Sequence, residues 1–269
     1  ARSGRPGPVV IDLPKDILMG LGQYEDFSQV EHRTYQPTMK AGKSEIEKAV
    51  SMIASAKKPL FYCGGGVINS GPKASKQLGR LVKLTGAPIT LTLMGLGAYP
   101  ATDKQFLGML GMHGTYEANL AMHDADLIVA VGARFDDRIT GRLDAFAPNS
   151  EKIHIDIDPS SINKNVAVDL PIVGDVGSVL DQMLRVWKDK EFKTKAKAMK
   201  AWWSQINDWR TMDCLKYDQS GSVIKPQFAI ERLYENTKDM DCYITTEVGQ
   251  HQMWAAQFYK FNEPNRWMT

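Results

Sequence analysis

The chain has 269 residues, of which 43% are hydrophobic and 24% charged, a balance typical of a soluble globular protein with one large or two medium domains. Its 33 basic and 31 acidic side chains give a formal net charge of +2, too near neutral to indicate a nucleic-acid partner. Because no apolar run could cross a bilayer and the three cysteines lack metal-ligand spacing, we expect neither a membrane nor a zinc protein, but a cytoplasmic one.

Both ends of the sequence lack the features of natural termini. Ala1 stands in place of a starting methionine, and residues 9–13 form an apolar run that we interpret as a strand. Residues 266–269 follow without a helix cap or a polar tail. We therefore expect an internal piece of a longer protein, in which the first strand pairs with a segment outside this sequence.

Helical and strand patterns alternate from residue 43 onward. Ser44 and Glu47 have the spacing of a capping box, and apolar residues follow them at helical intervals. We expect further helices from about residues 73 and 176, and strands at 59–63, 88–92, 127–131, 153–157 and 171–173. Apolar strands that alternate with helices predict an α/β fold, with a doubly wound parallel sheet covered on both faces.

The patterns divide the sequence into five segments: residues 1–18, 19–42, 43–187, 188–224 and 225–269. The second segment is polar and irregular, as linkers are, and the third holds the predicted sheet. The fourth is charged and rich in tryptophan, so we interpret it as a helical connector whose tryptophans pack. The last has a helix, a strand at 243–246 and a sharp turn at Gly249, and we regard it as incomplete.

The carboxyl ends of the predicted strands carry glycines and functional side chains. Ligands of open parallel sheets bind beyond these ends, where backbone amides and helix N-termini point. The strand exits hold residues 64–66, 92–95, 110–114, 132–138, Asp156 and Asp175. Several exits along one edge make a long crevice, which suits an adenine dinucleotide, although the GxGxxG fingerprint is absent after the first strand.

Each exit also has a structural alternative. The glycines at 64–66 could form a tight turn, and Asp156 could cap a helix instead of accepting hydrogen bonds from ribose. Residues 134–138 could be a surface ion-pair network, although an arginine there could bind a carboxylate or phosphate. His113 could be an exposed loop residue. His251 could be structural or could lie beside an anion site at the start of a helix.

These segments together resemble the catalytic subunit of the acetohydroxyacid (acetolactate) synthases, over essentially the whole chain. The strings GMLGMHGT at 108–115, ARFDDR at 133–138 and VGQHQMWAAQ at 248–257 occur in this order and are specific in combination. The resemblance implies an enzyme with thiamine diphosphate, Mg²⁺ and FAD. Such an enzyme decarboxylates pyruvate and transfers the two-carbon unit to pyruvate or 2-ketobutyrate, in valine, leucine and isoleucine biosynthesis.

The resemblance also implies roles for individual residues. The FAD contacts would be Arg5, Gly65, Thr92, Leu93, Leu110, Gly111, Met112, His113, Gly132, Arg134, Asp136, Asp156, Ile157, Asp175 and Val176. The residues over the thiamine diphosphate would be Val248, Gly249, Gln250 and His251. Arg138 would hold the carboxylate of the second ketoacid, and Lys15 would lie near the channel to the active site. The cofactor-activating glutamate and the Mg²⁺ ligands would lie outside this sequence, so the isolated chain is expected to be inactive.

By the same resemblance, residues 1–18 would end a pyrimidine-binding domain, 43–187 would be the FAD-binding domain, and 225–269 would begin a diphosphate-binding domain. The implied partners are a second copy, as a homodimer or tetramer, and a regulatory small subunit, with no nucleic acid and no membrane. Two alternatives stay open. One is another FAD-containing enzyme of the superfamily, such as a glyoxylate carboligase or pyruvate oxidase, and the other is a flavin-binding module without catalysis.

Overall fold

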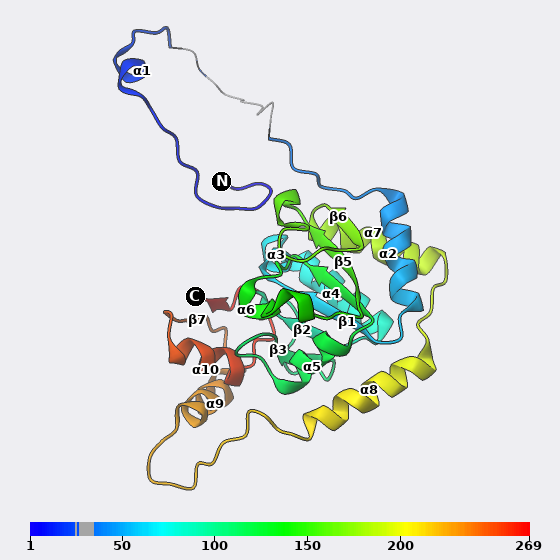
Figure 1. The fold of residues 1–269 in the computed structure, drawn as a ribbon. Helices are drawn as coiled ribbons and strands as arrows, with labels where there is room; N and C mark the ends of the chain where they lie inside the picture. The colour runs from blue at the N-terminus through cyan, green and yellow to red at the C-terminus, as the bar shows by residue number, and fades with distance from the viewer. Residues whose placement is uncertain (25, 27–34) are drawn as a thin grey trace.

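A six-stranded parallel sheet forms the centre of the molecule (Figure 1). The computed structural model describes residues 1–24, 26 and 35–269. The strands run in the order β3-β2-β1-β4-β5-β6, and every neighbouring pair is parallel. Their bounds are β1 Pro59–Cys63, β2 Ile89–Leu91, β3 Phe106–Met109, β4 Leu127–Val131, β5 Glu151–Asp156 and β6 Leu170–Val173. The predicted parallel α/β sheet is confirmed.

Helices cover both faces of this sheet. They are α2 Lys43–Ser55, α3 Gly65–Asn69, α4 Pro72–Thr85, α5 Tyr116–Asp124 and α7 Val176–Asp189, and the single-turn helix α6 Asp137–Thr140 lies at the sheet edge. The connection from β1 to β2 and the one from β3 to β4 run in opposite directions across the sheet. Because parallel crossovers are right-handed, α4 and α5 lie on opposite faces. Helix α7 packs against α2 and α4, so these three share a face.

Burial explains which strands the sequence revealed. Every residue of β1 and β4 is buried, because both strands lie in the middle of the sheet with cover on both faces. Strand β3 was not predicted, because it lies at the sheet edge and contains Gly108. A Cβ atom at Gly108 would lie 2.4 Å from the Thr115 side chain, so this strand needs glycine for the turn that follows it.

Two local predictions are wrong. Helix α2 begins two residues earlier than the Ser44 cap implied: Gly42 is the N-cap, and its N–H donates to Glu45 at 2.9 Å. Glu47 instead forms an ion pair with Lys190 at 2.9 Å. Residues 9–13 form no strand among the described residues, and Val10 is 92% exposed. Their apolar pattern has no neighbouring strand to pair with here.

Helix α8, Ala196–Arg210, closes the amino-terminal edge of the sheet. The buried indole of Trp202 donates to the carbonyl of Pro59, the first residue of β1, at 3.1 Å. Trp203 donates to the carbonyl of Gly86, just before β2, at 2.8 Å. The tryptophans therefore pack, as predicted, and they do so at the edge opposite to the strand exits.

The C-terminal part forms a smaller unit beside the sheet (Figure 1). It contains α9 Pro226–Thr237, α10 Gln250–Phe258 and a short parallel pair, β7 Ile244–Thr245 with β8 Trp267–Met268. Backbone hydrogen bonding from Ala101 to Phe261 at 3.0 Å joins this unit to the segment after β2. At the other terminus, the exposed helix α1, Lys15–Met19, lies on an arm that extends away from the sheet (Figure 1).

Candidate functional site

The strand order reverses direction between β1 and β4, and their exits meet backbone to backbone. Crevices form at such switch points in open sheets. The N–H of Gly66 donates to the carbonyl of Gly132 at 2.9 Å, and a Cβ atom at Gly66 would lie 2.6 Å from the Gly132 Cα atom. The glycines at 64–66 therefore do not form only a turn, because Gly65 and Gly66 begin α3. The close contact between Gly66 and Gly132 requires residues without a Cβ atom.

The exits of β2 and β3 lie next to this contact. Thr92 donates its N–H to the carbonyl of Cys63 at 2.9 Å, and Leu93 begins a 3-10 turn that ends at Gly95. Leu110 donates to the carbonyl of Leu91 at 3.3 Å. Since all six strands are parallel, the predicted exits share one edge of the sheet.

The loop at residues 110–114 links two parts of this edge. The N–H of Met112 donates to the carbonyl of Arg138 at 3.1 Å, which ties the loop to the exit of β4. The side chain of Gln257, on α10, donates to the carbonyl of His113 at 2.8 Å. The side chains of Met112 and His113 are exposed. The loop thus connects the crevice with the C-terminal unit.

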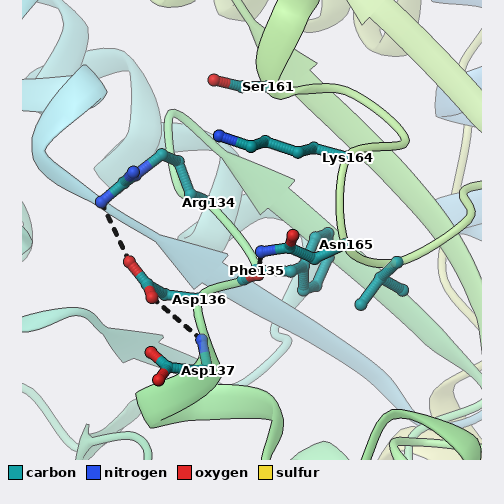
Figure 2. A pocket seen from close by; sticks show the side chains of 8 residues that line it. Arg134, Phe135, Asp136, Asp137, Ser161, Lys164 and Asn165 are labelled. Carbon is teal, nitrogen blue, oxygen red and sulfur yellow. Dashed lines mark hydrogen bonds and ion pairs between the residues drawn. The ribbon is translucent and has the colours of Figure 1, made fainter.

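A cavity of about 280 Å³ lies between the exits of β4 and β5 (Figure 2). It is lined by Arg134, Phe135, Asp136, Asp137, Ser161, Lys164, Asn165 and Val166. Arg134 pairs with Asp136 at 2.9 Å, and Asp136 also caps α6 by accepting from the Asp137 N–H at 2.9 Å. Hydrogen bonding with Asp137 and the charges of Arg134 and Arg138 lower the pKa of Asp136. Asp136 is thus ionised, and Arg134 is held toward the cavity.

Sequence reasoning missed one wall of this cavity. Ser161, Lys164 and Asn165 follow β5 in a segment that has no glycine exit pattern. The backbone of Asn163 turns with φ of +58°, and Asn165 donates to the carbonyl of Phe135 at 2.6 Å, which joins the two walls. Figure 2 shows Lys164 extending toward the Arg134 side of the cavity. Within the described part of the chain, Lys164 has no ion-pair partner.

Buried rings support the Arg134 loop from below. Phe135 is 4% exposed and packs edge-to-face on His154, with ring centroids 5.4 Å apart. The hydroxyl of Tyr62, on β1, donates to the carbonyl of Arg134 at 2.9 Å. Burial raises the pKa of Tyr62, so the phenol stays protonated and keeps its donor. The loop is therefore fixed to the sheet at two successive residues.

The exit of β5 brings Asp156 and the N-terminal arm together. Asp156 accepts from the Asp158 N–H at 2.9 Å, and burial raises the pKa of its carboxyl group. Arg5 pairs with Asp158 at 3.2 Å, although 153 positions separate them. Arg5, Asp156 and Ile157 therefore lie at the same end of the sheet edge. Asp156 caps no helix, because the N-cap of the 3-10 turn Pro159–Ser161 is Asp158, and the second oxygen of Asp156 faces His154 at 3.8 Å.

Asp175 is committed to its own helix. It is the N-cap of α7, and its carboxylate accepts from the Ser178 N–H at 2.9 Å and from the Ser70 hydroxyl at 2.7 Å. Val176 is buried beneath it. These two residues lie at the predicted edge, but the Asp175 side chain joins α7 to the end of α3. Each of its carboxylate oxygens already accepts a hydrogen bond from the protein.

The central part of the chain matches a known family. Residues 46–183 match the central domain of the thiamine pyrophosphate enzymes, which is about half of the chain. The chain belongs to the thiamine pyrophosphate enzyme family. The predicted family is thereby confirmed, and the matched residues run from the first turn of α2 to near the end of α7.

Individual proteins also match over the entire chain. It is 50% identical to the acetolactate synthase isozyme 3 large subunit of Escherichia coli and 48% identical to the acetolactate synthase large subunit of Haemophilus influenzae. It is 43% identical to the acetolactate synthase of Mycobacterium leprae. These alignments include 100% of this chain but 47%, 47% and 43% of the three relatives. The chain thus spans about half the length of the curated relatives it matches.

The start of α10 presents free backbone amides, the groups that bind anions at helix N-termini. Gly249 is the N-cap, and the amides of the first turn, including those of Gln250 and His251, have no acceptor within the helix. The positive end of the helix dipole adds to this preference for an anion. Val248 is 80% exposed, and His251 is also exposed, so the loop is open to a ligand.

The structure does not bring all the expected site residues together. Lys15 lies on the extended arm and is exposed, whereas Arg138 lies on α6 at the sheet edge (Figure 1). Among the described residues, no group of three or more His, Cys, Asp and Glu side chains is arranged to hold a metal ion. In the same part of the chain, no helix is long and apolar enough to cross a membrane.

Proposed function

We propose that the chain is part of the catalytic subunit of an acetolactate synthase. The main support is the identity of up to 50% to acetolactate synthase large subunits over the whole chain. The proposed reaction decarboxylates pyruvate and joins the two-carbon unit to pyruvate or 2-ketobutyrate, in the biosynthesis of branched-chain amino acids. When bound, thiamine diphosphate supplies the electron sink for the decarboxylation.

The proposed thiamine diphosphate contacts are Val248, Gly249, Gln250 and His251. The free amides of the first turn of α10 support this assignment, because helix N-termini bind phosphate groups. The Mg²⁺ ion that belongs with the diphosphate is proposed to take ligands from outside this sequence. The neighbouring loop at 110–114, held by Gln257, would place the two cofactors side by side.

The proposed FAD site follows the sheet edge. Gly65 and Gly132 would let the cofactor approach the backbone, because neither carries a side chain. A Cβ atom at Gly132 would lie 2.6 Å from the Gly66 Cα atom, whereas one at Gly65 would lie 3.3 Å from Met94. Arg5 and Arg134 would face its phosphates, while Asp156 would accept from ribose. To these we add Ser161 and Lys164, two hydrogen-bond donors on the cavity wall that the sequence did not reveal. The other FAD contacts remain as expected from the sequence.

We also propose the five-segment division with its boundaries at residues 18, 42, 187 and 224. Its support is that all six strands of the sheet, and helices α2 to α6, lie between 43 and 187. A dimer or tetramer with a regulatory small subunit in the cytoplasm completes the proposal. The term large subunit in the relatives' names supports a smaller partner.

The test uses a polypeptide of the relatives' length that contains this chain. Supplied with thiamine diphosphate, Mg²⁺ and FAD, it should convert pyruvate to acetolactate and show a flavin absorbance spectrum. In parallel reactions, glyoxylate should not be ligated to a product, and pyruvate with phosphate should not give acetyl phosphate. Acetolactate formation by the 269-residue chain alone would contradict the proposed division of catalytic roles. Flavin binding without any product would instead favour a binding module.

A further inference from the structure

A row of polar side chains crosses the sheet one residue below the strand exits. In the registered parallel strands, Thr90, Tyr62, Ala130, His154 and Pro171 lie side by side. Residues aligned in this way point to the same face of a sheet. Ala130, between Tyr62 and His154 in the row, carries no polar group. The row thus carries three polar groups into a largely apolar layer.

Two of these three groups have their hydrogen bonds, and the third does not. Thr90 donates to the carbonyl of Gly108 at 2.8 Å, and Tyr62 donates to the carbonyl of Arg134 at 2.9 Å. His154 is 0% exposed, yet neither ring nitrogen has a hydrogen-bond partner among the described residues. A buried polar group without a partner is costly, so its presence calls for a role.

The charged neighbour of His154 is the carboxylate at the strand exit. Asp156 lies two residues further along β5, on the same face, and its Oδ2 atom is 3.8 Å from His154 Nε2. Asp158 and, through it, Arg5 lie on the other side of this carboxylate. Burial lowers the pKa of His154. The charge of Asp156 and the backbone of Ala133 act to raise this pKa, but burial is the larger effect, so the ring is neutral and carries one N–H. The Phe135 ring packs nearly perpendicular to the imidazole, at 78°.

We propose that His154 is a positioning residue, whose Nε2–H orients the Asp156 carboxylate to accept a hydrogen bond from a ribose hydroxyl of a bound nucleotide. The inference rests on the proposed flavin-nucleotide site and adds the residue that makes this site selective for ribose. Asp156 Oδ1 is already occupied by the Asp158 N–H, so Oδ2 is the oxygen left for the ligand. A small rotation of the carboxylate would close the 3.8 Å gap to His154.

The test compares ADP with 2′-deoxy-ADP and 3′-deoxy-ADP as probes of the full chain. The unaltered chain should prefer ADP to one of the two analogues by roughly tenfold or more, the effect of one hydrogen bond to a charged group. In His154→Phe, which keeps an aromatic ring against Phe135, this preference should fall toward one. His154→Gln, whose amide nitrogen matches Nε2, should retain it, and His154→Asn, whose amide nitrogen matches Nδ1, should lose it.

Several results would overturn the inference. Equal weakening of all three nucleotides in His154→Phe would mean a purely structural role, and equal rescue by Asn and Gln would exclude Nε2. If the Phe variant does not fold, the unaltered chain decides: ¹⁵N signals of the His154 ring must shift with ADP and not with the disfavoured analogue. Loss of this selectivity in a chain that still binds FAD would contradict the inference and leave the proposed function intact. Absence of any nucleotide binding would contradict both the inference and the proposed function.

Discussion

At the scale of single residues, the strand exits contain two kinds of charged side chain. Asp136 and Asp175 cap helices, so their carboxylates already have backbone partners. Arg138 is exposed, and within the described residues no carboxylate pairs with it. Lys164 has the same freedom. The free cations are the side chains available for anionic ligands, and the capping carboxylates mainly hold the loops in place.

Replacing Arg138 with alanine should impair use of the second ketoacid. In the protein of the relatives' length, we expect the KM for the acceptor to rise by a factor that corresponds to about 1.5–3 kcal/mol, the range for hydrogen bonds to charged groups. Steady-state kinetics with 2-ketobutyrate as the variable substrate measures this. Arg142→Ala is the matched control, because Arg142 is 79% exposed and paired with Asp144. An unchanged acceptor KM in Arg138→Ala would remove its proposed role.

His154 should make the chain less stable in mild acid. Because burial lowers the pKa of His154, the unfolded chain takes up a proton below about pH 6.5 that the folded chain resists. The free energy of unfolding should therefore fall as the pH drops through this value. In His154→Phe the fall should be smaller, whereas in His123→Gln, on the exposed face of α5, it should persist. Urea unfolding at a series of pH values between 5 and 8 provides the comparison, and parallel curves for all three proteins would refute it.

At the scale of elements, prediction succeeded where one strong pattern decided the outcome. The buried strands β1 and β4 are apolar throughout, and α7 carries apolar residues at helical intervals, so all three were evident. Strand β8 and edge strand β3 were not, because short strands depend on neighbours distant in sequence. The Lys164 wall was missed for the same reason: only folding brings it opposite Arg134.

The contact between the exits of β1 and β4 should tolerate no methyl group. In Gly66→Ala the new Cβ atom would lie 2.6 Å from the Gly132 Cα atom and 2.9 Å from its carbonyl oxygen, so backbone must move. We expect a loss of about 1–3 kcal/mol of stability, as for other overpacked sites. Gly79→Ala, inside α4 with open space around it, should instead gain about 0.5–1 kcal/mol. Chemical denaturation of both variants tests this, and a neutral Gly66→Ala would contradict the close contact.

At the scale of the whole molecule, the C-terminal unit and the sheet meet through a tight backbone contact. Gly97, with φ of +87°, lies in the segment after β2, and a Cβ atom there would be 2.1 Å from the carbonyl oxygen of Glu263. Asn262 accepts hydrogen bonds from both the backbone and the hydroxyl of Thr102, at 3.1 and 3.0 Å. The proposed diphosphate loop on α10 is thus held against the proposed flavin edge.

Gly97→Ala should loosen the C-terminal unit and spare the sheet. Amide hydrogen exchange should accelerate in α9 and α10, whereas β1 and β4 should keep their protection, because the collision is confined to the contact. Gly71→Ala is a suitable control: its φ of +98° imposes similar backbone strain, but nothing lies within 4 Å of the new methyl group. Equal acceleration of α9 and α10 exchange in both variants would show that strain, and not the lost contact, is responsible.

The pairing of Arg5 with Asp158 has a consequence for how the N-terminal arm and a ligand affect each other. These two side chains lie 153 positions apart, on an arm and on the sheet, and their ion pair is partly exposed to solvent. If a phosphate group of the ligand paired with Arg5, this ion pair would be stronger than the one between Arg5 and Asp158. The arm and the ligand would then each favour the docking of the other. Saturating nucleotide should then slow proteolytic cleavage of residues 1–14, which would make the arm a reporter of occupancy at the nucleotide site.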